Sequence, residues 1–162
     1  MLILIQTLKV LSDEMAGVHK MDSKMPIIRF ANLEEAKLCM QEWQRRLYLD
    51  DWIIKLNFAN HEDFEATLGL NTANPEMKSC VITLIDVPKR LSDNHVITYC
   101  QEATLVHELL HCYDYVRPVG EGTYEQMMAN AMKHQNTEMM ARSFIEAKYG
   151  LERSFWVNQS AC

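Results

Sequence analysis

The sequence predicts an α+β domain in which a small, mostly antiparallel sheet packs against a motif-bearing helix and a second long helix. Three observations support this class. Short stretches of alternating apolar and polar residues fall between about residues 52 and 85, and apolar residues at helical spacing appear before and after them. The chain has 162 residues, enough for one domain with its own core. We therefore interpret residues 1–162 as a single domain, with residues 1–25 as an N-terminal helical extension.

Two helices are predicted before the strands. Apolar residues recur at helical spacing over residues 4–19, although a strand over residues 2–5 is an open alternative. The second helix begins after Asn32, because Asn is a favoured N-cap and Glu35, three residues later, can complete a capping box. We expect it to end before Asp50.

The central part of the chain predicts three strands. Residues 52–58 and 64–70 alternate between apolar and polar side chains, and residues 80–85 are more uniformly apolar. Residues 71–75 have the composition of a turn. The strand over residues 80–85 is either an interior strand or an edge to which an extended peptide could add.

Two further helices follow. One spans about residues 97–116 and is stopped by Pro118, and the other spans about residues 123–149. Gly150 stands just past the end of the second, where glycine commonly closes a helix.

Composition narrows the class of partners and the compartment. The net charge of -6 argues against a nucleic-acid partner, since no basic surplus is present to neutralise phosphates. The longest apolar run near the N-terminus, Met1–Ile5, is too short to span a membrane, so no membrane partner is expected. Five irregularly spaced cysteines indicate reduced thiols and a cytoplasmic location.

The segment His107-Glu-Leu-Leu-His111 carries the strongest chemical signal. On a helix, residues i and i+4 share one face, so the two imidazoles can bind one Zn²⁺ ion while Glu108 lies beside it. A catalytic zinc usually has three protein ligands and one open position, and a neighbouring carboxylate can act as the general base. The pattern therefore predicts a hydrolytic zinc site with Glu108 as its base.

The third ligand is expected from the following helix. We assign it to Glu138, because that helix can return across the motif helix and Ala141 would let the two approach closely. His134 lies one turn earlier on the same face and is retained as a catalytic residue that lines the site. An alternative in which His134 is itself the third ligand stays open.

The stretch Thr104-Leu-Val-His-Glu-Leu-Leu-His-Cys-Tyr-Asp-Tyr-Val-Arg117 resembles the active-site segment of the Atp23 family of metallopeptidases. His134-Gln-Asn-Thr-Glu138-Met-Met-Ala141 is similar to that family's second segment, whose glutamate is taken as a zinc ligand. Glu138, Ala141 and Phe144 also resemble a segment of the ImmA/IrrE-type peptidases. These resemblances imply a zincin-like fold and a minimal gluzincin site of His107, His111 and Glu138. They also imply that Asp114 orients one of the metal ligands.

We therefore expect a zinc-dependent metallopeptidase whose partner is a peptide or protein substrate; a homo-oligomer is compatible with the sequence. One alternative is a zincin-fold binding or regulatory module that keeps zinc but cleaves little. Another is a structural zinc site, for which Cys112 points to the wrong face of its helix. The N-terminal helix could serve as a pro-segment, a lid or a docking element.

Overall fold

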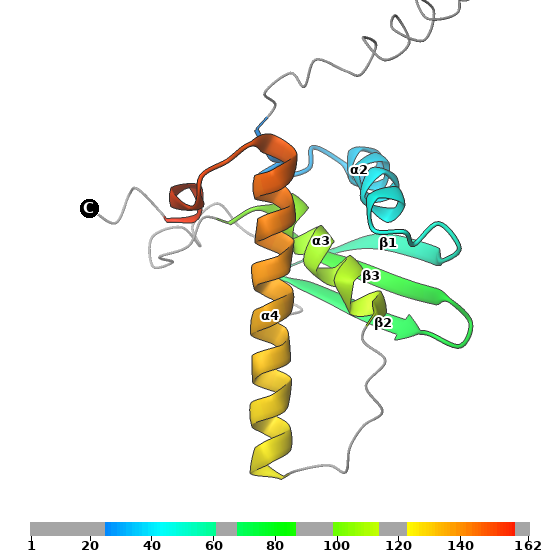
Figure 1. The fold of residues 1–162 in the computed structure, drawn as a ribbon. Helices are drawn as coiled ribbons and strands as arrows, with labels where there is room; N and C mark the ends of the chain where they lie inside the picture. Colours follow the sequence, from blue (N-terminus) through cyan, green and yellow to red (C-terminus); the bar gives the residue numbers. More distant parts are fainter. Residues whose placement is uncertain (1–24, 61–67, 87–98, 114–122, 158–162) are drawn as a thin grey trace, which may run out of the picture.

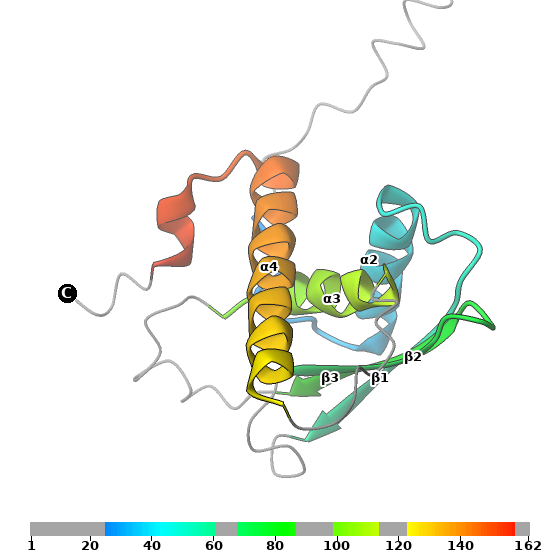
Figure 2. The same ribbon diagram turned by 60° about the horizontal axis from the view of Figure 1, so that its bottom comes forward.

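The computed structural model describes residues 25–60, 68–86, 99–113 and 123–157, with the backbone alone for residues 124–126. The elements in chain order are α2 (Leu33–Arg46), β1 (Ile53–Asn60), β2 (Gly69–Asn74), β3 (Ser79–Asp86), α3 (Gln101–Leu110), η3 (His111–Tyr113), α4 (Tyr124–Tyr149) and η4 (Arg153–Trp156). Helices α2 and α3 cover one face of the sheet, and α4 crosses α3 (Figures 1 and 2). The predicted α+β class is confirmed. The helix expected over residues 4–19 lies outside the described residues.

The ends of α2 and α4 follow from local sequence. Asn32 Oδ1 accepts a hydrogen bond from the Glu35 amide at 2.9 Å, and Glu35 Oε2 accepts one from the Ala31 amide at 2.6 Å. Together they satisfy amides that a helix start leaves free. Gly150 adopts φ of +64° directly after α4, a conformation that costs glycine little. Both predicted boundaries are confirmed.

The sheet is small, as expected, but mixed rather than mostly antiparallel. Its strand order is β1-β3-β2, with β3 parallel to β1 and antiparallel to β2. The strand at residues 80–85 is therefore interior, and its alternative as a peptide-binding edge is wrong. The most apolar strand, β3, lies between the other two, and its residues Ile82, Leu84 and Ile85 are fully buried.

The turn expected at residues 71–75 is also wrong. Asn71–Asn74 continue β2 and pair with β3, and the chain reverses over residues 75–78, where the Lys78 amide donates to the Pro75 carbonyl at 3.1 Å. Pairing with the apolar neighbour outweighs the weak turn preference of a short polar stretch. Of the strand expected at residues 64–70, residues 68–70 are described, and Gly69 and Leu70 begin β2.

The motif helix α3 is shorter than predicted and lies at the centre of the fold. It begins after Cys100, whose Sγ accepts from the Ala103 amide at 3.4 Å, and it tightens into η3 at His111. It packs against α2, α4 and strands β2 and β3. Leu105, Val106 and Leu109 are fully buried, so core packing fixes the helix that carries the motif.

Glu102, in the first turn of α3, joins three other parts of the fold. Its carboxylate is fully buried. Oε1 accepts hydrogen bonds from Trp43 Nε1 of α2 at 2.8 Å and from Lys148 Nζ of α4 at 2.9 Å. Tyr149 of α4 donates to Oε2 at 2.8 Å, and so does the Ile27 amide at 2.9 Å. A buried carboxylate is tolerated where a cation and several donors surround it.

The four described cysteines, Cys39, Cys80, Cys100 and Cys112, are all free and buried. They behave as small apolar core residues, as the sequence predicts. Cys112 Sγ lies 3.5 Å from Cys80 Sγ. It therefore faces the sheet, which agrees with the expectation that Cys112 does not join the histidines.

Candidate metal centre

Helix α3 presents His107, Glu108 and His111 near its carboxyl end. The two histidines are four residues apart, and their Nε2 atoms approach to 3.1 Å. Their rings are nearly perpendicular, with centroids 4.8 Å apart. This contact fits a hydrogen bond from one Nε2–H to the other Nε2, and it also fits two Nε2 lone pairs directed at one metal ion.

Helix α4 brings His134 to the same point. Its ring centroid lies 4.7 Å from that of His107 and 5.9 Å from that of His111. One nitrogen from each of the three rings falls within 4.8 Å of the others. The small Ala141 is almost fully buried one helical turn beyond Glu138, as expected for a close approach of α3 and α4.

The three imidazoles fit a divalent metal ion. A tetrahedral zinc with bonds of about 2.0–2.1 Å separates its nitrogen ligands by roughly 3.3 Å. The 3.1 Å between the Nε2 atoms of His107 and His111 is close to that spacing. The His134 side chain is exposed, so its nitrogen can move from within 4.8 Å of the other two to the spacing that a metal ion requires. Three imidazoles suit several transition metals, so the ligand set alone does not identify the ion.

Glu138, predicted from the sequence as a ligand, lies on the opposite side of the His107 ring. Its Oε2 is 3.0 Å from His107 Nδ1, whereas Nε2 of that ring faces His111. His107 Nδ1 is buried and forms no hydrogen bond with the described residues, so its contact with Glu138 is close but poorly aligned. In this position Glu138 can orient His107 rather than bind the ion beside it.

Arg142 holds Glu138 in place from one turn further along α4. Arg142 donates to Glu138 Oε1 from Nε at 2.8 Å and from Nη2 at 2.6 Å. Interaction with His107, and then with Arg142, lowers the pKa of Glu138 to about 2 despite partial burial. The carboxylate is therefore charged at neutral pH. Sequence reasoning did not single out Arg142, although its spacing of four from Glu138 is that of a helical ion pair.

Glu108 projects into a buried position beside the histidines. It is 5% exposed, and burial, with a smaller contribution from the negative charge of Glu138, raises its pKa to about 7, against the opposing effect of His107. A carboxylate with a pKa near neutrality can accept and return a proton. The role of Glu108 as a general base, which the motif predicts, stays a prediction.

Strand β2 positions Glu108 through two residues that sequence reasoning missed. A Cβ on Gly69 would lie 2.6 Å from Glu108 Oε1, so only glycine leaves room for the carboxylate. Asn71 Nδ2 donates to the Glu108 carbonyl, one of those left free where α3 ends. A glycine inside a strand often marks such a close approach, and this was the available signal.

Replacing Gly69 with Ala is expected to displace the Glu108 side chain while the histidines stay in place. We expect about 1–3 kcal/mol of destabilisation from overpacking. A shift of about 1 Å in a catalytic group can lower turnover about 10²-fold. The amount of metal bound per chain, measured by elemental analysis, should be unchanged. Gly150→Ala is the control, because no atom lies within 4 Å there; it should lose stability through its positive φ and keep its turnover.

Two residues that follow the motif lie outside the cluster as described. The Tyr113 hydroxyl donates to the carbonyl of Leu47, the residue that caps α2. Asp114, expected to orient a metal ligand, lies outside the described residues. Glu138 and Arg142 fill a comparable supporting role on His107.

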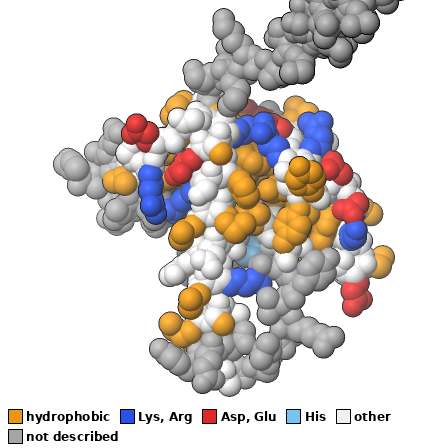
Figure 3. Space-filling view, in the orientation of Figure 1, with side chains coloured by type: hydrophobic (Ala, Val, Ile, Leu, Met, Phe, Trp, Pro, Cys, Tyr) orange, Lys and Arg blue, Asp and Glu red, His pale blue; other side chains and the backbone are white. Residues whose placement is uncertain are grey.

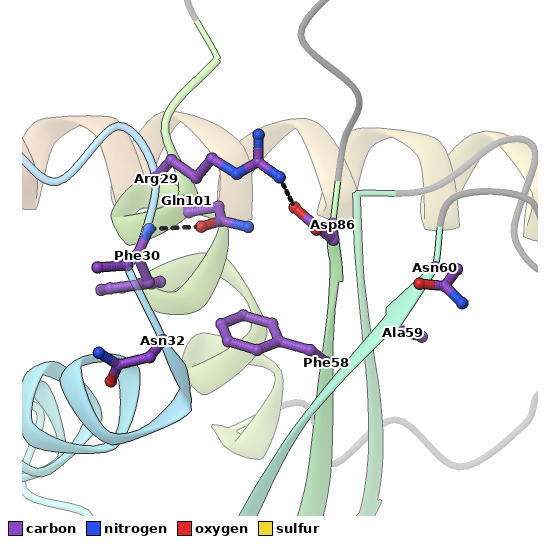
Figure 4. A pocket seen from close by; sticks show the side chains of 9 residues that line it. Arg29, Phe30, Asn32, Phe58, Ala59, Asn60, Asp86 and Gln101 are labelled. Atoms are coloured by element: carbon purple, nitrogen blue, oxygen red, sulfur yellow. Dashed lines mark hydrogen bonds and ion pairs between the residues drawn. The ribbon is translucent and has the colours of Figure 1, made fainter.

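A separate pocket of about 470 Å³ lies at the carboxyl ends of β1 and β3 (Figure 4). Its polar lining is largely paired internally: the Phe30 amide donates to Gln101 Oε1 at 2.7 Å, and Arg29 forms an ion pair with Asp86. No histidine of the cluster lines it. It therefore offers no second set of metal ligands.

Comparison of the chain with models of protein families, with curated proteins and with solved structures finds no match in any of the three. In the parts of the chain that the structure describes, no helix is both long and apolar enough to cross a bilayer. What the chain does is therefore argued from the geometry of the histidine cluster and its surroundings.

Proposed function

We propose that this chain is a zinc-dependent metallopeptidase with a zincin-like arrangement of motif helix and sheet. One observation carries the proposal: three histidine nitrogens converge beside a buried glutamate. Three ligands with an open position are typical of catalytic zinc, whereas structural sites are usually closed by four. The core position of Cys112, against Cys80, argues against a cysteine as fourth ligand.

The ligands proposed are His107, His111 and His134, with Glu138 as the residue that orients His107. Metal-binding histidines usually give their second nitrogen to a carboxylate, and Glu138 occupies that position. The assignment of Glu138 as third ligand, which the sequence favoured, stays the competing prediction. It requires the carboxylate to leave both His107 Nδ1 and Arg142.

The residues around the cluster have separate roles in the proposed hydrolysis. When bound, zinc would act as a Lewis acid toward a peptide carbonyl and toward water. Glu108 accepts the proton of the attacking water and returns it to the leaving amine. Gly69 and Asn71 hold Glu108 from the side of the sheet. Arg142 keeps Glu138 charged, and this favours the Nδ1–H tautomer of His107.

A peptide substrate is favoured by the strand next to the motif helix. Within the described residues β2 has a sheet partner on one side only, and it packs against α3 and η3. An extended peptide that added to this edge would pass beside Glu108, because Gly69 of β2 touches that side chain. We therefore assign the peptide-binding edge to β2 instead of the strand at residues 80–85.

The experiment is hydrolysis of an unfolded protein by the purified full-length chain. We expect new amino termini to form with the zinc-loaded chain, to disappear after treatment with a chelator, and to return on addition of Zn²⁺. A matched His107→Ala variant should remain inactive at every step. A zinc-loaded chain that cleaves no unfolded protein or peptide mixture would contradict the proposal and favour a zinc-containing binding module.

A further inference from the structure

An apolar groove of about 640 Å³ lies between the end of α2, the end of α3 and the carboxyl-terminal half of α4. Side chains that line it are unusually exposed for their type: Tyr113 and Met140 are each 49% exposed and Phe144 is 36% exposed. Figure 3 shows the hydrophobic surface gathered between α4 and α2, with histidine surface at its border. Such a contiguous exposed apolar surface usually marks a binding site.

One end of the groove is lined by residues that neighbour the histidines in sequence, although no described histidine lines the groove itself. Leu110, at one end, directly precedes the proposed ligand His111, and Thr137 lies one helical turn after His134. Along α4 the lining continues to Lys148. The eleven residue steps from Thr137 to Lys148 span about 16 Å of helix at 1.5 Å each. An extended peptide covers that length with about five residues.

The charges along the groove are of one sign. Its charged lining residues are Arg46 and Lys148, both at the α2 end, and no carboxylate belongs to the lining. Lys148 is held by the buried Glu102 and by Glu42, and its side chain is only 11% exposed. Arg46 also pairs with Glu42, but half of its side chain is exposed, so Arg46 is the cation that can face a bound acidic group. The surface near the histidines is apolar, formed by Leu110, Met140 and Phe144. The groove thus suits an apolar group at one end and an acidic group at the other.

We propose that this groove selects the substrate: it takes the part of the peptide that continues beyond the β2 edge, with a large apolar side chain next to the cleaved bond and an acidic group a few residues away. This inference rests on the proposed function for the identity of the bond that is cut. Methionine and aromatic residues provide an adaptable apolar surface for such a side chain. Discrimination against a small side chain at a hydrophobic site of this kind is about 10- to 200-fold.

The test is peptide binding to the Glu108→Gln variant, in which the probe should persist uncut. The probes are fluorescein-labelled nine-residue peptides with either Phe or Ala at the centre and Glu or Lys four residues further on. We expect the Phe peptide to bind about 10-fold or more tightly than the Ala peptide. The Glu-containing probe should bind more tightly than its Lys counterpart, and raising the salt concentration should reduce that difference.

Two neighbouring methionines on α4 supply the matched variants. Met140 lines the groove, whereas Met139 is 57% exposed and does not. Met140→Glu should abolish the preference for Phe, and Met139→Glu should retain it, with the zinc content of both unchanged. Equal binding of the Phe and Ala probes, or an equal effect of both substitutions, would overturn the inference.

Two further outcomes separate this inference from its alternatives. If the wild-type chain binds the Phe probe selectively but cleaves nothing, the groove is a peptide site and the proposed hydrolysis is wrong. If Met140→Glu leaves the peptide preference intact but changes the sedimentation of the chain, the groove is a contact between two copies and the inference is wrong.

Discussion

Replacing Glu108 with Gln is expected to reduce peptide hydrolysis about 10²- to 10⁴-fold, the usual contribution of a general base. The amide has nearly the shape of the carboxylate, so it still fits against Gly69, and the backbone carbonyl of residue 108 that Asn71 caps is unchanged. It cannot accept the proton of the attacking water. The three histidines are untouched, and the variant should bind zinc as the wild type does.

The measurement is kcat with a peptide that the wild type cleaves, together with the zinc content of each sample. Glu34→Gln provides the control, because it makes the same chemical change at a side chain that is 78% exposed on α2. Its kcat should equal that of the wild type. A Glu108→Gln variant that is zinc-loaded and cleaves within a few-fold of the wild type would refute the role of Glu108.

Replacing Glu102 with Ala is expected to lower the free energy of unfolding by about 3–5 kcal/mol, because it removes one member of a buried ion pair. Lys148 would keep its charge with only the partly exposed Glu42 as partner, and Trp43 and Tyr149 would lose their acceptor. Typical domains are stable by only about 5–15 kcal/mol, so this loss is a large fraction of the total.

Urea denaturation monitored by tryptophan fluorescence measures this effect. Glu102→Gln, which keeps one acceptor oxygen but no charge, should fall between the wild type and the alanine variant. Glu34→Ala should change stability by less than about 1 kcal/mol, as for an exposed ion pair. A Glu102→Ala variant as stable as Glu34→Ala would show that the buried cluster contributes nothing to the fold.

Local signals predicted the start of α2 and the end of α4 well, and the sheet less well. The Asn32 cap and Gly150 act through contacts within a few residues, so sequence reasoning could place the ends of α2 and α4. The position of β3 between β1 and β2 depends on pairings between distant segments, which alternation along one strand does not encode. The turn-like residues 71–75 were misassigned for the same reason.

In the candidate site, too, local spacing predicted some contacts and tertiary packing decided the others. Helical spacing was enough to place His107 and His111 together and to bring His134 and Glu138 to one face of α4. Whether His134 or Glu138 faces the Nε2 atoms of the two motif histidines depends on how α4 crosses α3. Periodicity along one helix does not specify that crossing. Gly69 and Asn71 belong to another strand, so their contacts with Glu108 became apparent only in three dimensions.

The most direct test of the three-histidine centre is a zinc competition titration of the wild type, His134→Ala and Glu138→Gln. We predict one zinc per wild-type chain. Loss of an orienting carboxylate typically weakens metal binding about 10- to 100-fold, so Glu138→Gln should fall in that range and His134→Ala should lose more. Binding that survives His134→Ala but collapses in Glu138→Gln would contradict the account and make Glu138 the third ligand.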